Sequence, residues 1–342
     1  MFKRLKRWAG GQAQVHARAP LTRGPVDHVV ILDGTMSNLT PGCETNAGLC
    51  YKLLCEMAPS ANLSLLYEAG LQWDRWGQSW NVATGVGINR QIRRAYGFIA
   101  SRYRPGDRIF LFGYSRGAFA VRSLAGVIDR VGLLRRDQAT MRNIREVYRH
   151  YSRDPDSFAA KVFAATYCHD EVKVEMVGVW DSVKALGLRW PVFWRLFEAR
   201  HRFHSPHLGR TVLHGYHALA RDETREAFAP ILWQTDARHA GQVTQMWFRG
   251  AHGDIGGQLG GFEAARPLSN IPLVWMMGKA ERCGLGLPVG WRARFPCDQN
   301  APSVGTLRGW GWLFLYRRKR RIGLDKSEEV FDFSAGGARA EP

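Results

Sequence analysis

The stretch that decides the fold is R-I-F-L-F-G-Y-S-R-G-A-F-A-V-R-S-L-A-G-V-I, at residues 108–128. It begins with a short apolar run, residues 108–112, which lies between Gly106 and Gly113 as a buried strand would. Beyond Ser115 the apolar residues recur every three or four positions, which is the spacing of a helix. The pattern therefore predicts a strand, a sharp turn and a helix, with Ser115 at the turn.

The turn itself, G-Y-S-R-G at residues 113–117, has the G-x-S-x-G pattern of a nucleophile elbow. A serine on such a turn is held in a strained conformation with its hydroxyl clear of the sheet, and the glycines remove side chains that would clash. The backbone amide of Arg116, at the helix start, is free to face a developing oxyanion. We expect Ser115 to be a nucleophile. The alternative is an ordinary glycine-rich turn with an inert serine.

Other apolar runs predict the rest of the sheet. Strands are predicted at residues 28–32, 63–67, 172–180 and 243–248, and helices at residues 88–103 and 267–284. The chain thus starts in the order strand, loop, strand, helix, strand, helix. This order implies an α/β fold with a mostly parallel central sheet and helices on both faces.

Three further segments complete the predicted domain. Residues 134–170 are charged and helical, and we expect an insertion packed on the sheet. Residues 186–210 include a cluster of aromatic side chains, which predicts either a lid with an acyl-chain pocket or core packing. Residues 214–229 are predicted to form a helix, in which D-E-T-R at residues 222–225 is a salt-bridged surface.

We divide the chain into a basic N-terminal arm at residues 1–25, an α/β domain at residues 26–300, and an aromatic and basic tail at residues 301–342. In the tail, an aromatic run abuts the five cations R-R-K-R-R at residues 317–321. Such a segment is typical of an interface with anionic lipid. The alternative is a last core element with a solvated basic end.

Three chemically complementary residues each follow a predicted strand: Ser115, Asp181 and His252. The carboxyl ends of parallel strands meet at one edge of a sheet, so these side chains are expected to converge there. An imidazole is needed to take the proton of a serine, and a carboxylate is needed to orient the imidazole. Their order along the chain, Ser, Asp, His, is that of α/β-hydrolases.

The loop after the first predicted strand, D-G-T-M-S-N at residues 33–38, lies at the same edge. Its backbone amides near Gly34 and Thr35 are candidates for the second donor of an oxyanion hole. We expect Asp33 to brace this loop rather than to take part in chemistry.

With these residues assembled, the sequence resembles a bacterial and fungal family of α/β-hydrolase domains that includes the phospholipase effectors of type VI secretion. Four blocks carry the resemblance: L-D-G-T-M-S-N at 32–38, G-Y-S-R-G-A at 113–118, G-V-W-D-S-V at 178–183 and F-R-G-A-H-G-D-I-G-G at 248–257. The resemblance implies Ser115 as nucleophile, His252 as base and an aspartate as the third member. We assign Asp181 to that role. Asp254 is the rival, although its place two residues from His252 suits a loop brace.

The composition indicates which kinds of binding partner the protein favours. The chain has 342 residues with 48 basic and 30 acidic side chains, a formal charge of +18, which favours anionic partners. Lipid is expected, and nucleic acid is disfavoured. None of the six cysteines forms a C-x-x-C pair, so we expect reduced thiols and no metal site. Without a secretory signal or a spanning run of about 20 apolar residues, a cytoplasmic or peripheral-membrane location is expected.

The sequence thus leads to two hypotheses. The first is a serine hydrolase that cleaves carboxylic esters, of phospholipid or a related lipid, through a Ser115 acyl-enzyme and without a cofactor. The second is a catalytically degenerate hydrolase fold that acts as a basic module binding a membrane or a partner. The complete set of Ser115, Asp181 and His252 favours the first.

Overall fold

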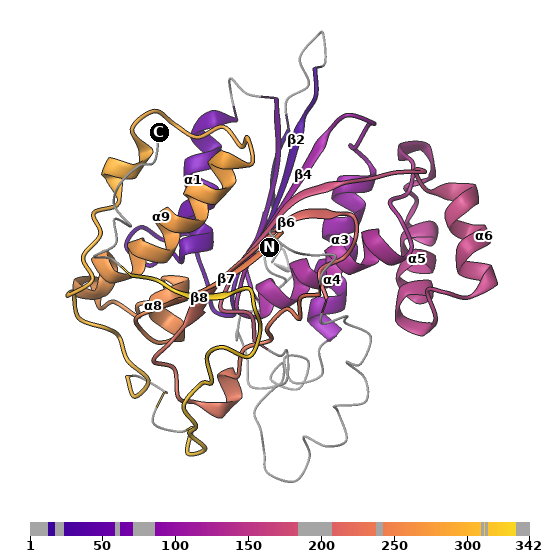
Figure 1. Cartoon of the computed structure of the whole chain (residues 1–342). Helices are drawn as coiled ribbons and strands as arrows, with labels where there is room; N and C mark the ends of the chain where they lie inside the picture. Colours follow the sequence, from indigo (N-terminus) through magenta and orange to yellow (C-terminus); the bar gives the residue numbers. More distant parts are fainter. Residues whose placement is uncertain are drawn as a thin grey trace, which may run out of the picture.

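A central sheet organises the protein (Figure 1). The computed structural model describes residues 13–17, 24–58, 62–70, 86–183, 207–236, 242–308, 311 and 314–332. Within these residues the sheet has eight strands in the order β1-β3-β2-β4-β5-β6-β7-β8. The strands are β1 (Ala13–Ala17), β2 (Asp27–Leu32), β3 (Leu63–Glu68), β4 (Arg108–Tyr114), β5 (Val174–Trp180), β6 (Val212–Ala220), β7 (Val243–Phe248) and β8 (Glu328–Val330).

The pairing of the strands gives the sheet one functional edge. Each neighbouring pair from β3 to β8 is parallel, and only β1 runs antiparallel, against β3. The carboxyl ends of β2, β4, β5, β6 and β7 therefore lie at the same edge. The predicted α/β class, with a mostly parallel sheet, is confirmed.

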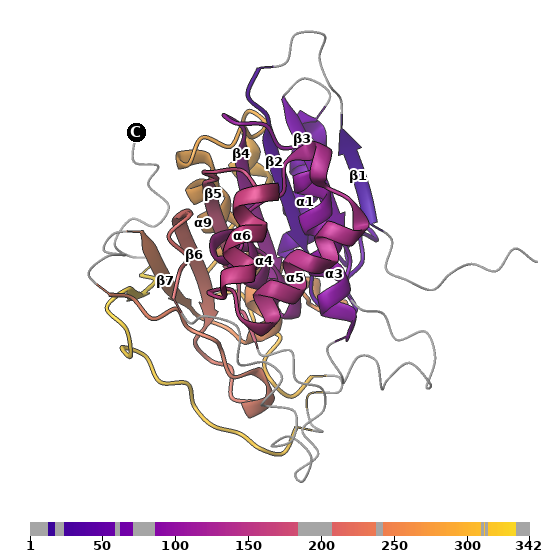
Figure 2. The ribbon, with the colours of Figure 1, turned by 90° about the vertical axis from the view of Figure 1, so that its right-hand side faces the viewer.

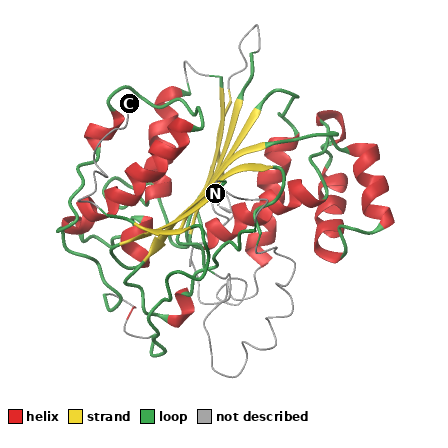
Figure 3. Ribbon diagram, viewed as in Figure 1, coloured by secondary structure: helices red, strands yellow, loops and turns green. Residues whose placement is uncertain are grey.

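Helices cover both faces of the sheet (Figure 3). One face packs on α1 (Asn46–Met57) and α9 (Arg266–Arg282), the other on α3 (Val86–Ala100) and α4 (Arg116–Arg130). β2 illustrates why. Its Val29 and Ile31 belong to the first core, and its Val30 and Leu32 to the second, because successive side chains of a strand point to opposite faces. An apolar run without alternation is what such a doubly covered strand requires.

The insertion at residues 134–170 is helical as predicted, but it lies one layer further out. It contains α5 (Met141–Arg153) and α6 (Phe158–Tyr167). α5 packs against α3 and α4 rather than on the sheet, and it buries Ile144, Val147 and Tyr151 there. Seen from that side, α3, α4, α5 and α6 lie in front of the sheet (Figure 2), and α6 is the outermost in Figure 1.

Two elements differ from the prediction. The predicted helix at residues 214–229 is wrong, because residues 212–220 form β6, which pairs in parallel with β5 and β7. Alanines in this stretch favour a helix locally, but pairing on both sides and burial on both faces override that preference. The segment predicted as a loop after β2 contains α1, whose start is capped by the Thr45 side chain accepting the Gly48 amide at 3.0 Å.

The segments assigned to an arm and a tail contribute to the sheet. β1, from the predicted N-terminal arm, pairs with β3, and β8, from the predicted tail, pairs with β7. The boundaries drawn at residues 25 and 301 therefore do not separate these segments from the domain. The predicted lid at residues 186–210 falls outside the described residues up to position 206.

β6 carries a fully buried histidine. The ring of His217 accepts the backbone N–H of Ser182 at Nε2, at 3.1 Å, so this nitrogen carries no proton. Burial, helped by the charge of Arg122, lowers the pKa of His217 from 6.5 to about 3. The folded protein thus holds a neutral imidazole at a pH where an unfolded chain would protonate it.

This histidine predicts acid sensitivity. Because the folded pKa is depressed, its contribution to stability is complete above pH 6.5 and is lost as the pH falls towards 3. Between about pH 7 and about pH 4.5, His217→Gln should lose roughly 2 kcal/mol less unfolding free energy than the wild type. Urea unfolding at the two pH values measures this. His214→Gln, a partly exposed neighbour on β6, is the control. Equal losses in all three proteins would contradict the prediction.

Candidate active site

Ser115 lies at the elbow between β4 and α4. Its φ of 56° and ψ of −118° place it in a strained region that non-glycine residues seldom adopt. A Cβ on Gly117 would lie 2.0 Å from the Leu32 carbonyl oxygen, and one on Gly113 would lie 2.6 Å from the Gly117 carbonyl oxygen. Both glycines are therefore required for the helix to approach the sheet so closely.

The structure brings the three predicted side chains together. His252 Nε2 lies 2.9 Å from Ser115 Oγ, and His252 Nδ1 lies 2.5 Å from Asp181 Oδ2. The serine, the histidine and the aspartate are 7%, 4% and 0% exposed. With the Nδ1–H donated to the carboxylate, Nε2 is unprotonated and can accept the serine hydroxyl proton.

Backbone strain is concentrated at this edge of the sheet. Among the described residues, the non-glycine residues with positive φ are Met36, Ser115 and Asp181. They follow β2, β4 and β5, respectively. Strained backbone persists where the surrounding structure over-determines it, and it clusters at functional sites.

The rival aspartate, Asp254, has a different role in the geometry. Its carboxylate accepts the Ala251 amide at 2.8 Å, the Ser303 hydroxyl at 2.5 Å and the Val304 amide at 2.8 Å. It therefore fixes the start of α8 (His252–Gly256) and ties it to residues 303–304. The ring of His252 bonds to Asp181 instead.

The carboxylate of Asp33 accepts hydrogen bonds from within the first loop and from outside it. It accepts the Gly34 amide at 2.6 Å, the Thr45 hydroxyl at 2.6 Å and the Tyr67 hydroxyl at 2.7 Å. Burial raises the pKa of Asp33 against these hydrogen bonds. The amide of Gly34 is consequently engaged by Asp33 in this structure.

Thr35, the next residue, is held from two sides. Its hydroxyl accepts a hydrogen bond from Arg116 Nε, and its carbonyl accepts one from Gln258 Nε2 at 2.9 Å. Burial lowers the pKa of Arg116 to about 10. These contacts fix the loop after β2 against the helix that starts at the elbow.

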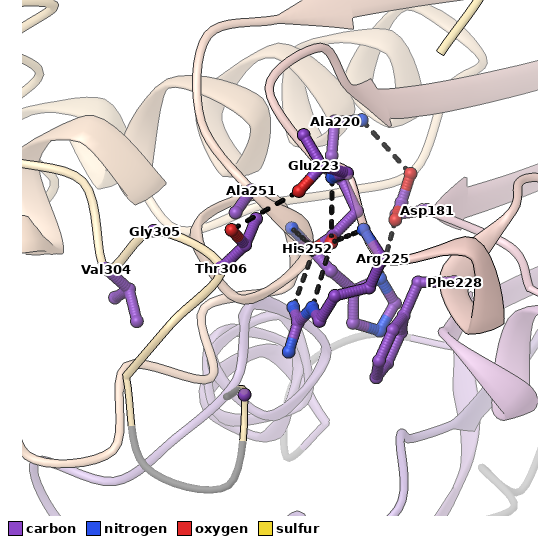
Figure 4. A network of polar contacts seen from close by, with 12 residues as sticks. Asp181, Ala220, Glu223, Arg225, Phe228, Ala251, His252, Val304, Gly305 and Thr306 are labelled. Atoms are coloured by element: carbon purple, nitrogen blue, oxygen red, sulfur yellow. Dashed lines mark hydrogen bonds and ion pairs between the residues drawn. The ribbon is translucent and has the colours of Figure 1, made fainter. Parts of the chain in front are cut away.

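The pair of Glu223 and Arg225 was predicted on the surface, and this prediction is wrong. Glu223 is 1% exposed, and its Oε2 accepts the His252 backbone amide at 3.1 Å and Arg225 Nη2 at 2.6 Å. The Arg225 guanidinium lies over the ring of Phe228, and that ring packs 4.7 Å from the imidazole. Figure 4 shows these side chains grouped around His252. Burial raises the pKa of Glu223, but Arg225 brings it below its usual value.

Arg320 is a further residue of the site that sequence patterns do not identify. Its guanidinium donates to both oxygens of Asp181, from Nη1 to Oδ1 at 2.5 Å and from Nη2 to Oδ2 at 2.9 Å. Periodicity and motifs could not identify it, because it lies in a run of five cations in which any member is a candidate for solvent.

Other chemistry is sparse in the described part of the chain. No cluster of three or more His, Cys, Asp or Glu side chains there could hold a metal ion. All six cysteines fall in this part and are free thiols, three of them buried. No helix among the described residues has the length and apolarity to cross a bilayer.

Comparison with known proteins gives the family. The model for the catalytic domain of Tle1-like phospholipase effectors of type VI secretion (T6SS) matches residues 27–279. A protein of Saccharomyces cerevisiae, "Uncharacterized protein YEL023C", is 30% identical in an alignment of length 253 that covers 67% of this chain and 36% of the yeast protein.

Solved structures are similar at a lower level. An uncharacterized protein from Pseudomonas aeruginosa has a TM-score of 0.44 at 14% identity, over 80% of this chain and 49% of that one. The Tle1 effector bound to the VgrG spike has a TM-score of 0.36 at 19% identity, over 75% of this chain and 55% of that one. The chain spans about a third of the length of the yeast relative and about half of these two structures. The family match covers most of the chain and confirms the resemblance carried by the four sequence blocks, so the chain belongs to the family of Tle1-like phospholipase effector catalytic domains.

Proposed function

We propose that the protein is a serine esterase that hydrolyses carboxylic esters of phospholipids or related lipids through an acyl-enzyme on Ser115. The observation that carries this proposal is the relay from Ser115 Oγ to His252 Nε2, at 2.9 Å, and from His252 Nδ1 to Asp181, at 2.5 Å. A strained elbow serine and a buried imidazole–carboxylate pair are the arrangement that activates a weak hydroxyl nucleophile. The family supports lipid as the substrate class.

The reaction follows from this geometry. Ser115 Oγ attacks the ester carbonyl while His252 Nε2 takes its proton, and the imidazolium then gives that proton to the leaving alcohol. In the second half, His252 takes a proton from water, which attacks the acyl-enzyme and releases the carboxylic acid. Asp181 holds the Nδ1–H throughout, which fixes the tautomer and stabilises the imidazolium.

The oxyanion hole is assigned to two backbone amides. Arg116 is the first residue of α4, so its N–H has no partner within the helix. The amide of Gly34 donates to Asp33, and we therefore favour Thr35 for the second donor. One such donor is worth roughly 10²–10³ in kcat.

A fluorophosphonate probe tests the nucleophile. The wild type should be labelled on Ser115, as located by peptide mass spectrometry, and Ser115→Ala should not be labelled. Asp181→Asn should fold and lose about 10⁴ in kcat on an ester substrate, because the imidazole tautomer is no longer held. Ser123→Ala removes another buried serine of α4 and should label as the wild type does. Wild type that resists the probe while folded, or label elsewhere, would refute the assignment.

We propose in addition that a surface beside the site binds anionic lipid. Residues 314–324 present the exposed apolar side chains of Leu315 and Leu324 among exposed Arg and Lys residues. Phe314 packs on Phe228, which packs on His252, so this segment reaches the reacting groups. Apolar side chains interleaved with cations are suited to an anionic bilayer interface.

Vesicle sedimentation tests this surface. Vesicles with phosphatidylserine should bind the protein, and vesicles of phosphatidylcholine alone should bind it several-fold less. The double variant Leu315→Ser and Leu324→Ser should weaken binding by roughly thirtyfold or more, because each substitution loses about 1–2 kcal/mol of apolar burial. Ser115→Ala should bind as the wild type does. Equal binding to both kinds of vesicle would count against the surface, and binding without turnover of any ester would favour a degenerate binding module instead.

A further inference from the structure

Among the five cations at residues 317–321, Arg320 is the one whose side chain contacts Asp181, the proposed catalytic acid. Its side chain is 5% exposed, whereas the other four cations at residues 317–321 are exposed. Besides the two bonds to Asp181, its guanidinium donates to the carbonyls of Ala220, at 2.8 Å, and Phe228, at 2.5 Å. Four acceptors thus hold a fork of nitrogens in one plane, which is the geometry that arginine matches best.

We propose that Arg320 is a positioning residue of the Ser115–His252–Asp181 relay, acting through the carboxylate of Asp181. This inference rests on the proposed function. Through this one side chain, residues 314–324 contribute to the proposed chemistry of the site. Arg320 acts on Asp181 and not on Ser115 or His252 themselves.

The first part of the role is geometric. Asp181 Oδ1 accepts Arg320 Nη1 and the Ala220 amide, the latter at 3.0 Å, which leaves Oδ2 turned towards His252 Nδ1. A carboxylate can rotate about its last bond, and the two-pronged contact removes that freedom. The orientation of the imidazole therefore depends on Arg320 indirectly, through the carboxylate of Asp181.

The second part is electrostatic. Asp181 is fully buried, and burial raises its pKa, but the charge of Arg320 and the hydrogen bonds from His252 and Arg320 hold the pKa well below the usual range. These contacts therefore favour the ionised form of the carboxylate. An unpaired carboxylate at this depth would instead favour taking up a proton.

The other charges around the imidazole are themselves compensated. On the backbone side, Glu223 is paired with Arg225. His217, which interacts electrostatically with Asp181, is neutral, and the charge of the Arg122 guanidinium helps to lower the pKa of that ring. Asp254 faces the start of α8, and the aromatic rings of Tyr114 and Phe228 flank the imidazole.

Removing Arg320 would leave one uncompensated negative charge beside the base. The Asp181–His252 pair would then take up a proton at a higher pH, and a protonated imidazole cannot accept the proton of Ser115. The acid limb of the pH profile for kcat/KM should therefore move to higher pH.

The pH profile with a soluble ester tests the role. In Arg320→Gln the acid limb should rise by about one pH unit, and kcat on the plateau should fall by about tenfold to a hundredfold as positioning is lost. Arg320→Lys keeps the charge but not the fork, so its acid limb should stay near that of the wild type while kcat falls. The matched control is Arg317→Gln, because Arg317 anchors the same segment to Thr306 and Gly311 and its acid limb should not move.

Two results would overturn the proposal. One is an Arg320→Gln protein that loses activity only in proportion to its folded fraction, with the acid limb in place. The other is an Arg320→Lys protein with the full kcat of the wild type, and this variant decides the matter if the glutamine variant does not fold.

A measurement without turnover separates this inference from the proposed function. In protein carrying ¹³C-labelled histidine, with His252→Gln used to assign the signal, NMR follows the pH at which the His252 ring takes up a proton. That pH should rise in Arg320→Gln whether or not the protein hydrolyses an ester. A failure to hydrolyse any ester or to bind the probe would refute only the proposed hydrolase function. An unchanged titration in the folded variant would refute the role of Arg320.

Discussion

The ionised carboxylate of Asp181 is the constraint on which the site depends. A charge that is fully buried must be compensated by opposite charge and by hydrogen bonds, or the group takes up a proton. Here the compensation comes from three directions: the Ala220 amide at the end of β6, the imidazole of His252 at the start of α8, and Arg320 from the segment before β8. Elements that are far apart in the chain are thus held together at one point.

Because the strands are parallel, little chain is needed to bring these residues together. β4, β5 and β7 end at the same edge, so Ser115, Asp181 and His252 each need only a short turn to reach the others. A second compensated pair, Glu223 with Arg225, holds the backbone amide of His252. We therefore regard the site as two buried acid–arginine pairs that fix one imidazole, which the proposed chemistry uses as a base.

The sequence predicted those parts in which local pattern and tertiary environment agree. The elbow around Ser115 was predictable, because its glycines and flanking apolar runs report a single local geometry. β6 was not, because its alanines suggest a helix and only pairing with neighbouring strands decides otherwise. Arg320 was out of reach for the same reason: nothing in a run of five cations tells which one is drawn inward by a carboxylate 139 positions away in the sequence.

Direct detection of the acyl-enzyme is the sharpest test of the account. The protein is mixed with a p-nitrophenyl ester, quenched in acid within one turnover, and analysed by intact-protein and peptide mass spectrometry. A single acyl group is expected on the peptide that contains Ser115, formed with a burst of p-nitrophenol and absent in His252→Gln. Turnover of the ester with no acyl group on the protein, or with the acyl group on another residue, would contradict it.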